Sequence, residues 1–266
     1  MMHIRDASAA DYPAYARLFP ELGPEFPVPS ERDWVETFAA EALVAERGGA
    51  VVGYVLGAPF GTMGHVSQLV VTPSCRREGL GRQLMFAMAE RFRAMGCDAW
   101  QLNVKRENAA AHATYRALGF SRKSTCSWVS LAPSSIEMLP RGAFEVHPLD
   151  PAHDAEVESQ FALRSGEIAW ARTFAGRLVH EVLRGSDRCG MGIYTPETRF
   201  VVPLRLRDPA ALFPLLASLP GAATEGVRIG VESDEALLAT ALRCGGTIDL
   251  ETDRLVAALP DATASR

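Results

Sequence analysis

The 266-residue chain lacks the cysteine patterns of a disulfide-bonded or zinc-binding protein. Its five cysteines are an odd number, and no two of them form a Cys-x-x-Cys pair. Secreted disulfide frameworks use paired cysteines, and structural zinc sites use closely spaced ligand pairs. We therefore expect no disulfide framework, no metal and a reducing, cytoplasmic compartment.

A secretory signal and a membrane span are also missing. The N-terminus has no apolar segment of the signal-peptide kind. Residues 48–75 contain no Asp, Glu, Lys or Arg, but glycines and prolines interrupt them repeatedly. A membrane helix needs about 20 continuous apolar residues, so this segment indicates strands joined by turns. We expect no membrane partner.

The chain has no marked excess of basic residues. Residues 1–132 carry 14 basic and 13 acidic side chains, and residues 133–266 carry 13 and 19. A surface that binds nucleic acid needs a cluster of basic side chains. We therefore expect no nucleic-acid partner.

The hydrophobic pattern predicts strands that alternate with helices. Residues 65–71 and 99–104 alternate as strands do, whereas residues 80–95 place Leu80, Leu84 and Met88 on one helical face. Asn108 can cap a helix that runs to Leu118, because its side-chain oxygen can accept from a first-turn N–H group. These elements indicate an α/β protein.

The pattern predicts that the second half repeats the first. An offset of 126 residues maps Asn108 onto Asp234 and Gly119 onto Gly245. The prolines, serines and glycine of residues 133–141 suggest a linker. We therefore predict one domain over residues 1–132, a linker over 133–141 and a second domain over 142–266.

A strand followed by a glycine-containing helix start forms the most informative motif. The strand ends at Val71, and the segment Arg76-x-x-Gly79-x-Gly81 then opens a helix. Glycine lets a ligand approach the backbone closely, and the unpaired N–H groups of a helix start attract phosphate. We predict a pyrophosphate site over residues 77–82, although a glycine pair is also compatible with a simple turn. The Gly-Lys-Ser/Thr of a P-loop and the Gly-x-Gly-x-x-Gly of a dinucleotide fold are both absent.

A second motif runs from Asn108 to Phe120, with the pattern Asn-x-x-Ala…Tyr-x-x-x-Gly-Phe. Together with Val71-Thr-Pro73 and Arg76-x-x-Gly79-x-Gly81, it resembles the GCN5-related N-acetyltransferase (GNAT) superfamily over about residues 3–130. The resemblance implies an α/β fold of two tandem GNAT-like domains. Each would have a mixed, mostly antiparallel central sheet, flanked by helices and splayed between its central strands.

The resemblance also implies acetyl-CoA as acyl donor. Its pantetheine arm would bind the backbone of the strand before the loop, and its pyrophosphate would bind the N–H groups at the helix start. The residues implied in donor binding are Leu69, Val70, Val71, Arg76, Arg77, Glu78, Gly79, Leu80, Gly81, Arg82 and Asn108.

In this family an amine attacks the thioester directly in a ternary complex. By resemblance, Tyr115 would protonate the departing sulfur, since a phenol can deliver a proton as charge builds there. Alternatively, its ring only packs on the sheet.

The base is less clearly marked. His65 lies on the strand before the loop and is similar in position to a proton-relaying imidazole of aralkylamine acetyltransferases. Strand alternation predicts that Ser67 shares its face and that Gln68 points to the other. Glu21 and Glu25 are rival candidates, and a purely structural histidine is a further alternative.

The second half lacks this chemistry. The region that matches the loop contains Asp208 and Pro209 instead of a glycine pair, and Ala241 stands where the offset places Tyr115. A carboxylate repels phosphate, and proline has no N–H group to donate. We predict a degenerate, non-catalytic copy.

The expected function is therefore transfer of the acetyl group of acetyl-CoA to a primary amine of a small molecule or peptide. Two alternatives stay open: a CoA- or acyl-CoA-binding sensor or interaction module without turnover, and transfer of a longer acyl group. A homodimer is also possible. Nothing in the sequence names the acceptor.

Overall fold

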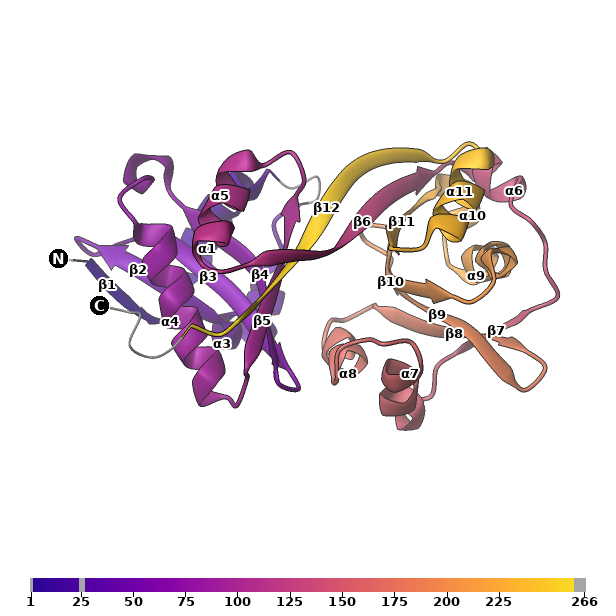
Figure 1. Ribbon diagram of the computed structural model, residues 1–266, viewed down its shortest axis with the longest axis horizontal. Helices are drawn as coiled ribbons and strands as arrows, with labels where there is room; N and C mark the ends of the chain where they lie inside the picture. Colours follow the sequence, from indigo (N-terminus) through magenta and orange to yellow (C-terminus); the bar gives the residue numbers. More distant parts are fainter. Residues whose placement is uncertain (1, 24–26, 261–266) are drawn as a thin grey trace. The chain divides into compact units, whose positions relative to one another are not determined.

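The computed structural model describes residues 2–23 and 27–260, and the chain forms two compact units (Figure 1). The first unit comprises Met1–Val104, Asn108–Arg122 and Leu255–Arg266, within the described ranges. The second unit comprises Lys105–Glu107 and Lys123–Arg254. Among the described residues, no helix has the length and apolar character needed to cross a bilayer.

The first unit is built from the N-terminal strands and helices. Its strands are β1 (Met2–Asp6), β2 (Ala42–Arg47), β3 (Ala50–Phe60), β4 (Met63–Val71) and β5 (Ala99–Lys105), with the ends of β6 (Ser121–Leu131) and β12 (Thr247–Ala258). Its α-helices are α1 (Tyr12–Leu18), α2 (Glu31–Asp33), α3 (Ala39–Glu41), α4 (Leu80–Ala94) and α5 (Ala109–Ala117). Shorter turns are the 3₁₀ helices η1 (Ala9–Asp11), η2 (Phe19–Leu22) and η4 (Pro73–Cys75) and the π-helical turn η3 (Trp34–Phe38).

The second unit contains the remaining elements. Its own strands are β7 (Glu145–Pro148), β8 (Leu178–Arg184), β9 (Asp187–Thr195), β10 (Phe200–Leu206) and β11 (Val227–Glu232). Its helices are α6 (Pro133–Glu137), η5 (Pro151–His153), α7 (Asp154–Gln160), α8 (Glu167–Arg172), η6 (Pro209–Ala211), α9 (Leu212–Ser218), α10 (Ala222–Glu225) and α11 (Glu235–Arg243).

The sheet of the first unit is mixed and mostly antiparallel, as predicted. Strands β1 to β4 pair antiparallel in sequence order, and β4 pairs parallel with β5. The parallel pairing covers only Met63–Val66 of β4 and Ala99–Leu102 of β5. Beyond Val66 the two central strands separate, which confirms the predicted splay.

The two faces of this sheet pack differently. On one side a Cβ on Gly64 would overlap the ring of Phe92 from α4, so we call this the α4 face. On the other side the ring of Tyr54 lies 5.2 Å from that of Tyr15, which stacks on Trp34 at 4.5 Å. We call this second side the aromatic face.

The second unit repeats this plan. The strand order is β6-β11-β10-β9-β8-β7, and the parallel pair β10–β11 is registered only at Phe200–Val201 with Arg228–Ile229. Helix α11 follows α5 at the predicted offset of 126 residues, and Asn108 and Asp234 each cap their helix through a side-chain oxygen. The internal repeat is confirmed.

The predicted domain boundaries differ from the compact units because the last strand of each copy is exchanged. The strand beside β5 is β12, and the strand beside β11 is β6. Leu255 of β12 lies in the core of the first unit, whereas Val129 of β6 lies in the core of the second. The compact units therefore differ from the predicted division at a linker over residues 133–141, because distant strands pair across it.

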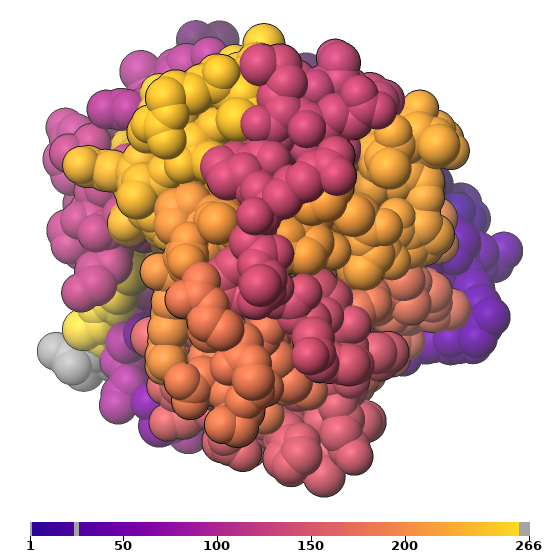
Figure 2. All heavy atoms as spheres, turned by 90° about the vertical axis from the view of Figure 1, so that its right-hand side faces the viewer, coloured from indigo at the N-terminus to yellow at the C-terminus, as the bar shows by residue number. Residues whose placement is uncertain are grey.

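The segment predicted as a linker, residues 133–141, contains a helix and buried side chains. It begins with α6, and Ser135, Ile136 and Leu139 are buried. Cys244 Sγ, at the end of α11, donates to Met138 O at 3.3 Å. Figure 2 shows this part of the chain against the yellow C-terminal part of the second unit. Pro133 opens a helix, where its missing N–H costs nothing.

A buried carboxylate in the first unit predicts a loss of stability in acid. Asp11 accepts from the Arg5 guanidinium at 2.8 and 2.9 Å and from Ser8, and these bonds lower the pKa of Asp11 from 3.8 to about 2. The carboxyl group of Asp11 therefore binds a proton more tightly in the unfolded chain than in the folded one. The contribution of ionised Asp11 to the free energy of unfolding is present above pH 4 and disappears as the pH falls towards 2. It is on the order of 2 kcal/mol.

Urea unfolding at pH 6 and pH 2.5 tests this expectation. The wild type should lose on the order of 2 kcal/mol more than Asp11→Asn between these pH values, since the variant has no titrating group there. An equal loss in both proteins would contradict it.

Candidate functional site

Strand β4 contains a bulge beside the splay. Leu56 pairs with Gln68 and Gly57 with Val66, so Ser67 is an extra residue whose Oγ donates to Leu56 O at 3.2 Å. A bulge shifts the alternation of side chains by one residue.

This bulge overturns the predicted faces of β4. Gln68 lies on the aromatic face, where its Oε1 accepts from Tyr54 Oη at 2.8 Å. His65 also lies on that face, with its ring centroid 6.2 Å from Phe60. The expectation that Ser67, and not Gln68, shares the side of His65 is therefore wrong.

The start of α4 presents a run of backbone N–H groups without acceptors. After β4 ends at Val71, Arg77 and Gly79 adopt positive φ angles of 63° and 81°. The first helical bond runs from Gln83 N to Gly79 O at 3.1 Å. In the described parts of the chain, the N–H groups of residues 77–82 donate to no protein acceptor. Such N–H groups, with the positive end of the helix dipole, form an anion site.

The charged side chains beside this loop are partly neutralised by others. Arg76 donates to Val71 O and pairs with Glu21 at 2.6 Å, and Glu78 pairs with Arg47 at 2.6 Å. The negative charge of Glu78 beside the loop is thus balanced by the guanidinium group of Arg47. Glu21, a predicted rival base, is held by Arg76, and Glu25 lies outside the described residues.

The structure accounts for the two motif glycines, Gly79 and Gly81, in different ways. Gly79 has a φ of +81°, which strongly favours glycine. At Gly81 an added Cβ would meet only side-chain carbons of Leu69 and Val71, both at 3.9 Å. The packing of the protein therefore permits a larger residue at position 81, and the space beside it is open to a ligand.

Tyr115 packs on the α4 side of the sheet. Its ring meets Phe120 edge-on at 5.8 Å, and it joins the same apolar core as Leu69 and Val71. Burial raises the pKa of the Tyr115 phenol to about 12. Within residues 2–23 and 27–260 its hydroxyl has no hydrogen-bond partner. Packing and proton donation are both compatible with this position.

The structure gathers the predicted donor-binding residues but separates the two predicted catalytic side chains. Residues 69–71 and 76–82 form one continuous path from β4 to α4. Asn108 Oδ1 accepts from Ala111 N at 3.0 Å, so its role as a helix cap is confirmed. His65 lies on the aromatic face and Tyr115 on the α4 face, on either side of the sheet that opens between β4 and β5.

Sequence reasoning assigned no role to Gln101, which lies on β5 beside His65 in the parallel register. Its side chain is buried, with 5% exposed, and its Nε2 has no partner within the described residues. The sequence feature that could have indicated it is a polar residue between the apolar residues Trp100 and Leu102 of a predicted strand.

The second unit fills its corresponding positions with its own groups. Asp208 Oδ1 accepts from Ala210 N at 2.9 Å, and the other carboxylate oxygen pairs with Arg184 at 2.7 Å. Where β10 and β11 separate, Glu232 pairs with Arg205 at 2.7 Å and with Arg254 at 3.0 Å. The helix start and the splay of this copy are therefore occupied by protein side chains.

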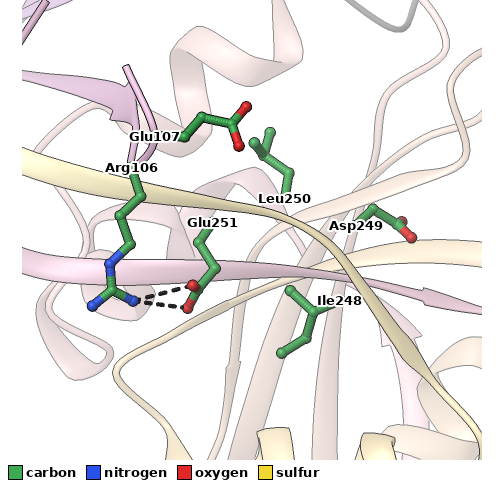
Figure 3. A pocket seen from close by; sticks show the side chains of 6 residues that line it. All are labelled: Arg106, Glu107, Ile248, Asp249, Leu250 and Glu251. Carbon is green, nitrogen blue, oxygen red and sulfur yellow. Dashed lines mark hydrogen bonds and ion pairs between the residues drawn. The ribbon is translucent and has the colours of Figure 1, made fainter. Parts of the chain in front are cut away.

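A separate hollow of about 370 Å³ lies in the second unit (Figure 3). It is lined by Arg106, Glu107 and residues 248–251, with Arg106 bonded to Glu251 at 3.1 Å. None of the predicted site residues lines it. In the described ranges, no group of three or more His, Cys, Asp or Glu side chains has an arrangement that could hold a metal ion.

Residues 8–120 match the profile of the acetyltransferase (GNAT) family. The first unit is similar to GNAT domains over this range. The match spans the bulged strand, the loop, the start of α4 and the segment from Asn108 to Phe120. The family is one of acetyltransferases, which use acetyl-CoA.

Solved structures extend the likeness to the whole chain. A putative acetyltransferase from Pyrococcus horikoshii has 14% identity and a TM-score of 0.76, covering 97% of this chain and 89% of that one. A tandem GNAT protein from the clavulanic acid biosynthesis pathway has 18% identity and a TM-score of 0.69, covering 98% and 100%. A GCN5-related N-acetyltransferase from Sphaerobacter thermophilus has 17% identity and a TM-score of 0.66, covering 97% and 96%. The chain thus has a tandem GNAT fold.

Proposed function

We propose that the first unit transfers the acetyl group of acetyl-CoA to a primary amine of a small molecule or peptide. The observation that carries this proposal is the run of N–H groups over residues 77–82. These groups have no acceptor among the described residues, and they follow the splayed strand β4. A pyrophosphate supplies the acceptors that these groups lack. The family match to residues 8–120 supports the same chemistry.

The residues present fit acetyl-CoA. Residues 69–71 would hold the pantetheine arm through backbone groups on the open edge of β4, and residues 77–82 would hold the pyrophosphate. Arg77 and Arg82 are exposed beside that helix start and would add positive charge. Bound acetyl-CoA would supply an activated acyl group as its thioester.

Two protons move in the proposed reaction. The amine nitrogen forms a bond to the acetyl carbon, the carbon–sulfur bond breaks, and the sulfur takes the proton of the Tyr115 hydroxyl. The amine gives up its proton to His65, directly or through water. An imidazole is suited to this role because its ordinary pKa lies near neutrality.

Titration calorimetry with acetyl-CoA tests the proposal. We expect one site per chain in the wild type, because Asp208 and the Glu232 cluster occupy the equivalent positions of the second unit. Gly81→Glu should abolish binding by placing a carboxylate beside the phosphates. Gln83→Glu is the matched control, since it adds the same charge to an exposed position of α4 whose N–H is already bonded to Gly79.

Gly81→Ala separates binding from folding. Alanine inside a helix is more favourable than glycine, so we expect the free energy of unfolding to rise by about 0.5–1 kcal/mol. Its methyl group would crowd the ligand, and we expect the Kd for acetyl-CoA to rise at least about tenfold, equivalent to about 1.4 kcal/mol.

The possible outcomes distinguish the competing functions. Two binding sites would show that the second unit is not degenerate, and absence of binding would overturn the acetyltransferase proposal. Binding without turnover on a panel of amines would favour a CoA sensor. Faster turnover with longer thioesters would favour a different acyl donor.

A further inference from the structure

The side chain of Gln101 carries a buried amide nitrogen without a hydrogen-bond partner in the described part of the chain. It is 5% exposed, and its Nε2 meets no acceptor. A buried amide without partners destabilises a fold, because it has lost its hydrogen bonds to water. A ligand that accepts a hydrogen bond from this group would explain why it is buried without a protein partner.

Gln101 stands where the sheet opens. It is the parallel neighbour of His65, and the next pair, Val66 with Leu102, is the last before β4 and β5 separate. Trp100 and Leu102 belong to the core on the α4 side. Because side chains alternate along a strand, Gln101 points to the aromatic face, where His65 also lies.

Two other polar side chains on this face have hydrogen-bond partners within the protein. Tyr54 donates to Gln68 at 2.8 Å, and Trp34 Nε1 donates to Ser8 O at 2.9 Å. The carboxamide of Gln101 is uncharged and offers both a donor and an acceptor. A group that complements both is another amide, which presents a carbonyl oxygen and an N–H group together.

We propose that Gln101 is a specificity-determining residue that pairs with an amide group adjacent to the acceptor amine. The inference rests on the proposed function and narrows the acceptor to α-amino amides, including the first residue of a peptide. Its Nε2 donates to the carbonyl oxygen of the substrate, which places the substrate amine beside His65 at the opening between β4 and β5.

The test compares two amines of similar shape, alaninamide and sec-butylamine, in the wild type and Gln101→Met. Methionine keeps the length of the side chain and removes its hydrogen-bonding groups. We expect kcat/KM for alaninamide to fall at least about tenfold, the value of one lost hydrogen bond of about 1.4 kcal/mol, and kcat/KM for sec-butylamine to stay within about twofold. The midpoint of thermal unfolding should be unchanged or higher, since an unsatisfied buried group has been removed.

A binding measurement keeps this inference separate from the proposed function. With CoA in place of acetyl-CoA no acetyl transfer occurs, and calorimetry should detect alaninamide binding to the wild type but not to Gln101→Met. If the wild type acetylates neither amine, the proposed function fails, and this binding difference still decides the role of Gln101. Equal losses for both amines, or a lower unfolding midpoint in both Gln101→Met and Gln101→Leu, would overturn the inference.

Discussion

Replacing Tyr115 with phenylalanine is expected to lower kcat for acetyl transfer by about 100-fold or more, the usual contribution of a positioned general acid. The phenol is half-buried on the α4 side of the sheet, and burial raises its pKa to about 12. It therefore stays protonated at neutral pH and can give its proton to the departing sulfur. The Kd for acetyl-CoA should change by less than about twofold, equivalent to about 0.4 kcal/mol, because the ring remains.

Steady-state kinetics combined with titration calorimetry measures both quantities. Tyr194→Phe is the matched control, since Tyr194 is a buried tyrosine of the second unit whose hydroxyl donates to Pro220 O at 2.8 Å. That variant should keep its kcat. An unchanged kcat in Tyr115→Phe would mean that the ring only packs against Phe120.

The pH dependence gives a second readout of Tyr115. Because its pKa is raised, ionisation of this phenol begins well above pH 10 in the folded protein. The wild-type rate should therefore show no decline from this group between pH 7 and pH 10. The pKa of this phenol is near 10 in the unfolded chain and higher in the folded one. Its contribution to the free energy of unfolding is therefore complete below pH 10 and disappears as the pH rises towards 12.

Replacing Glu232 with glutamine is expected to destabilise the second unit by about 2–4 kcal/mol, near the range for breaking a buried ion pair. The carboxylate is 10% exposed and bonds to Arg205, Arg254 and Ser124 where β10 and β11 separate. Without it, the two guanidinium groups face each other with no carboxylate between them. Burial already lowers the pKa of Arg254, which shows that its charge is poorly solvated.

Urea unfolding provides the measurement, with Glu225→Gln as control. Glu225 pairs with Arg199 at 2.7 Å, but 60% of its side chain is exposed. An exposed pair contributes only about 0–1 kcal/mol. The number of acetyl-CoA sites should stay at one per chain in both variants. A loss below about 1 kcal/mol in Glu232→Gln would show that the cluster is not a significant support of this unit.

Local sequence patterns predicted the features that depend on short stretches of chain. The glycines at 79 and 81, the caps at Asn108 and Asp234 and the 126-residue repeat all depend on neighbouring residues. The α/β class followed from the same patterns, whereas the mixed and splayed sheet was implied by the resemblance to GNAT proteins. The loss of the loop in the second copy was visible as Asp208 and Pro209.

Other features depend on contacts between distant residues, so no local pattern contains them. The bulge at Ser67 exists because the register between β3 and β4 shifts by one residue, and it places Gln68 on the aromatic face, opposite to the prediction. The buried amide nitrogen of Gln101 stands out only in the folded chain, where no acceptor lies near it among residues 2–23 and 27–260.

The division into units shows the same limit most clearly. In the structure, residues 121–131 and 247–258 are the last strands of the two copies, β6 and β12. Each offers similar backbone hydrogen bonds and apolar side chains, so either strand could in principle complete either sheet. The sequence by itself thus determined the two copies, the donor motif and the degenerate loop. Only the tertiary structure decided that β12 lies beside β5 and ends in the core of the first unit, and that β6 lies beside β11, because strand pairing and core packing between distant segments select the partner.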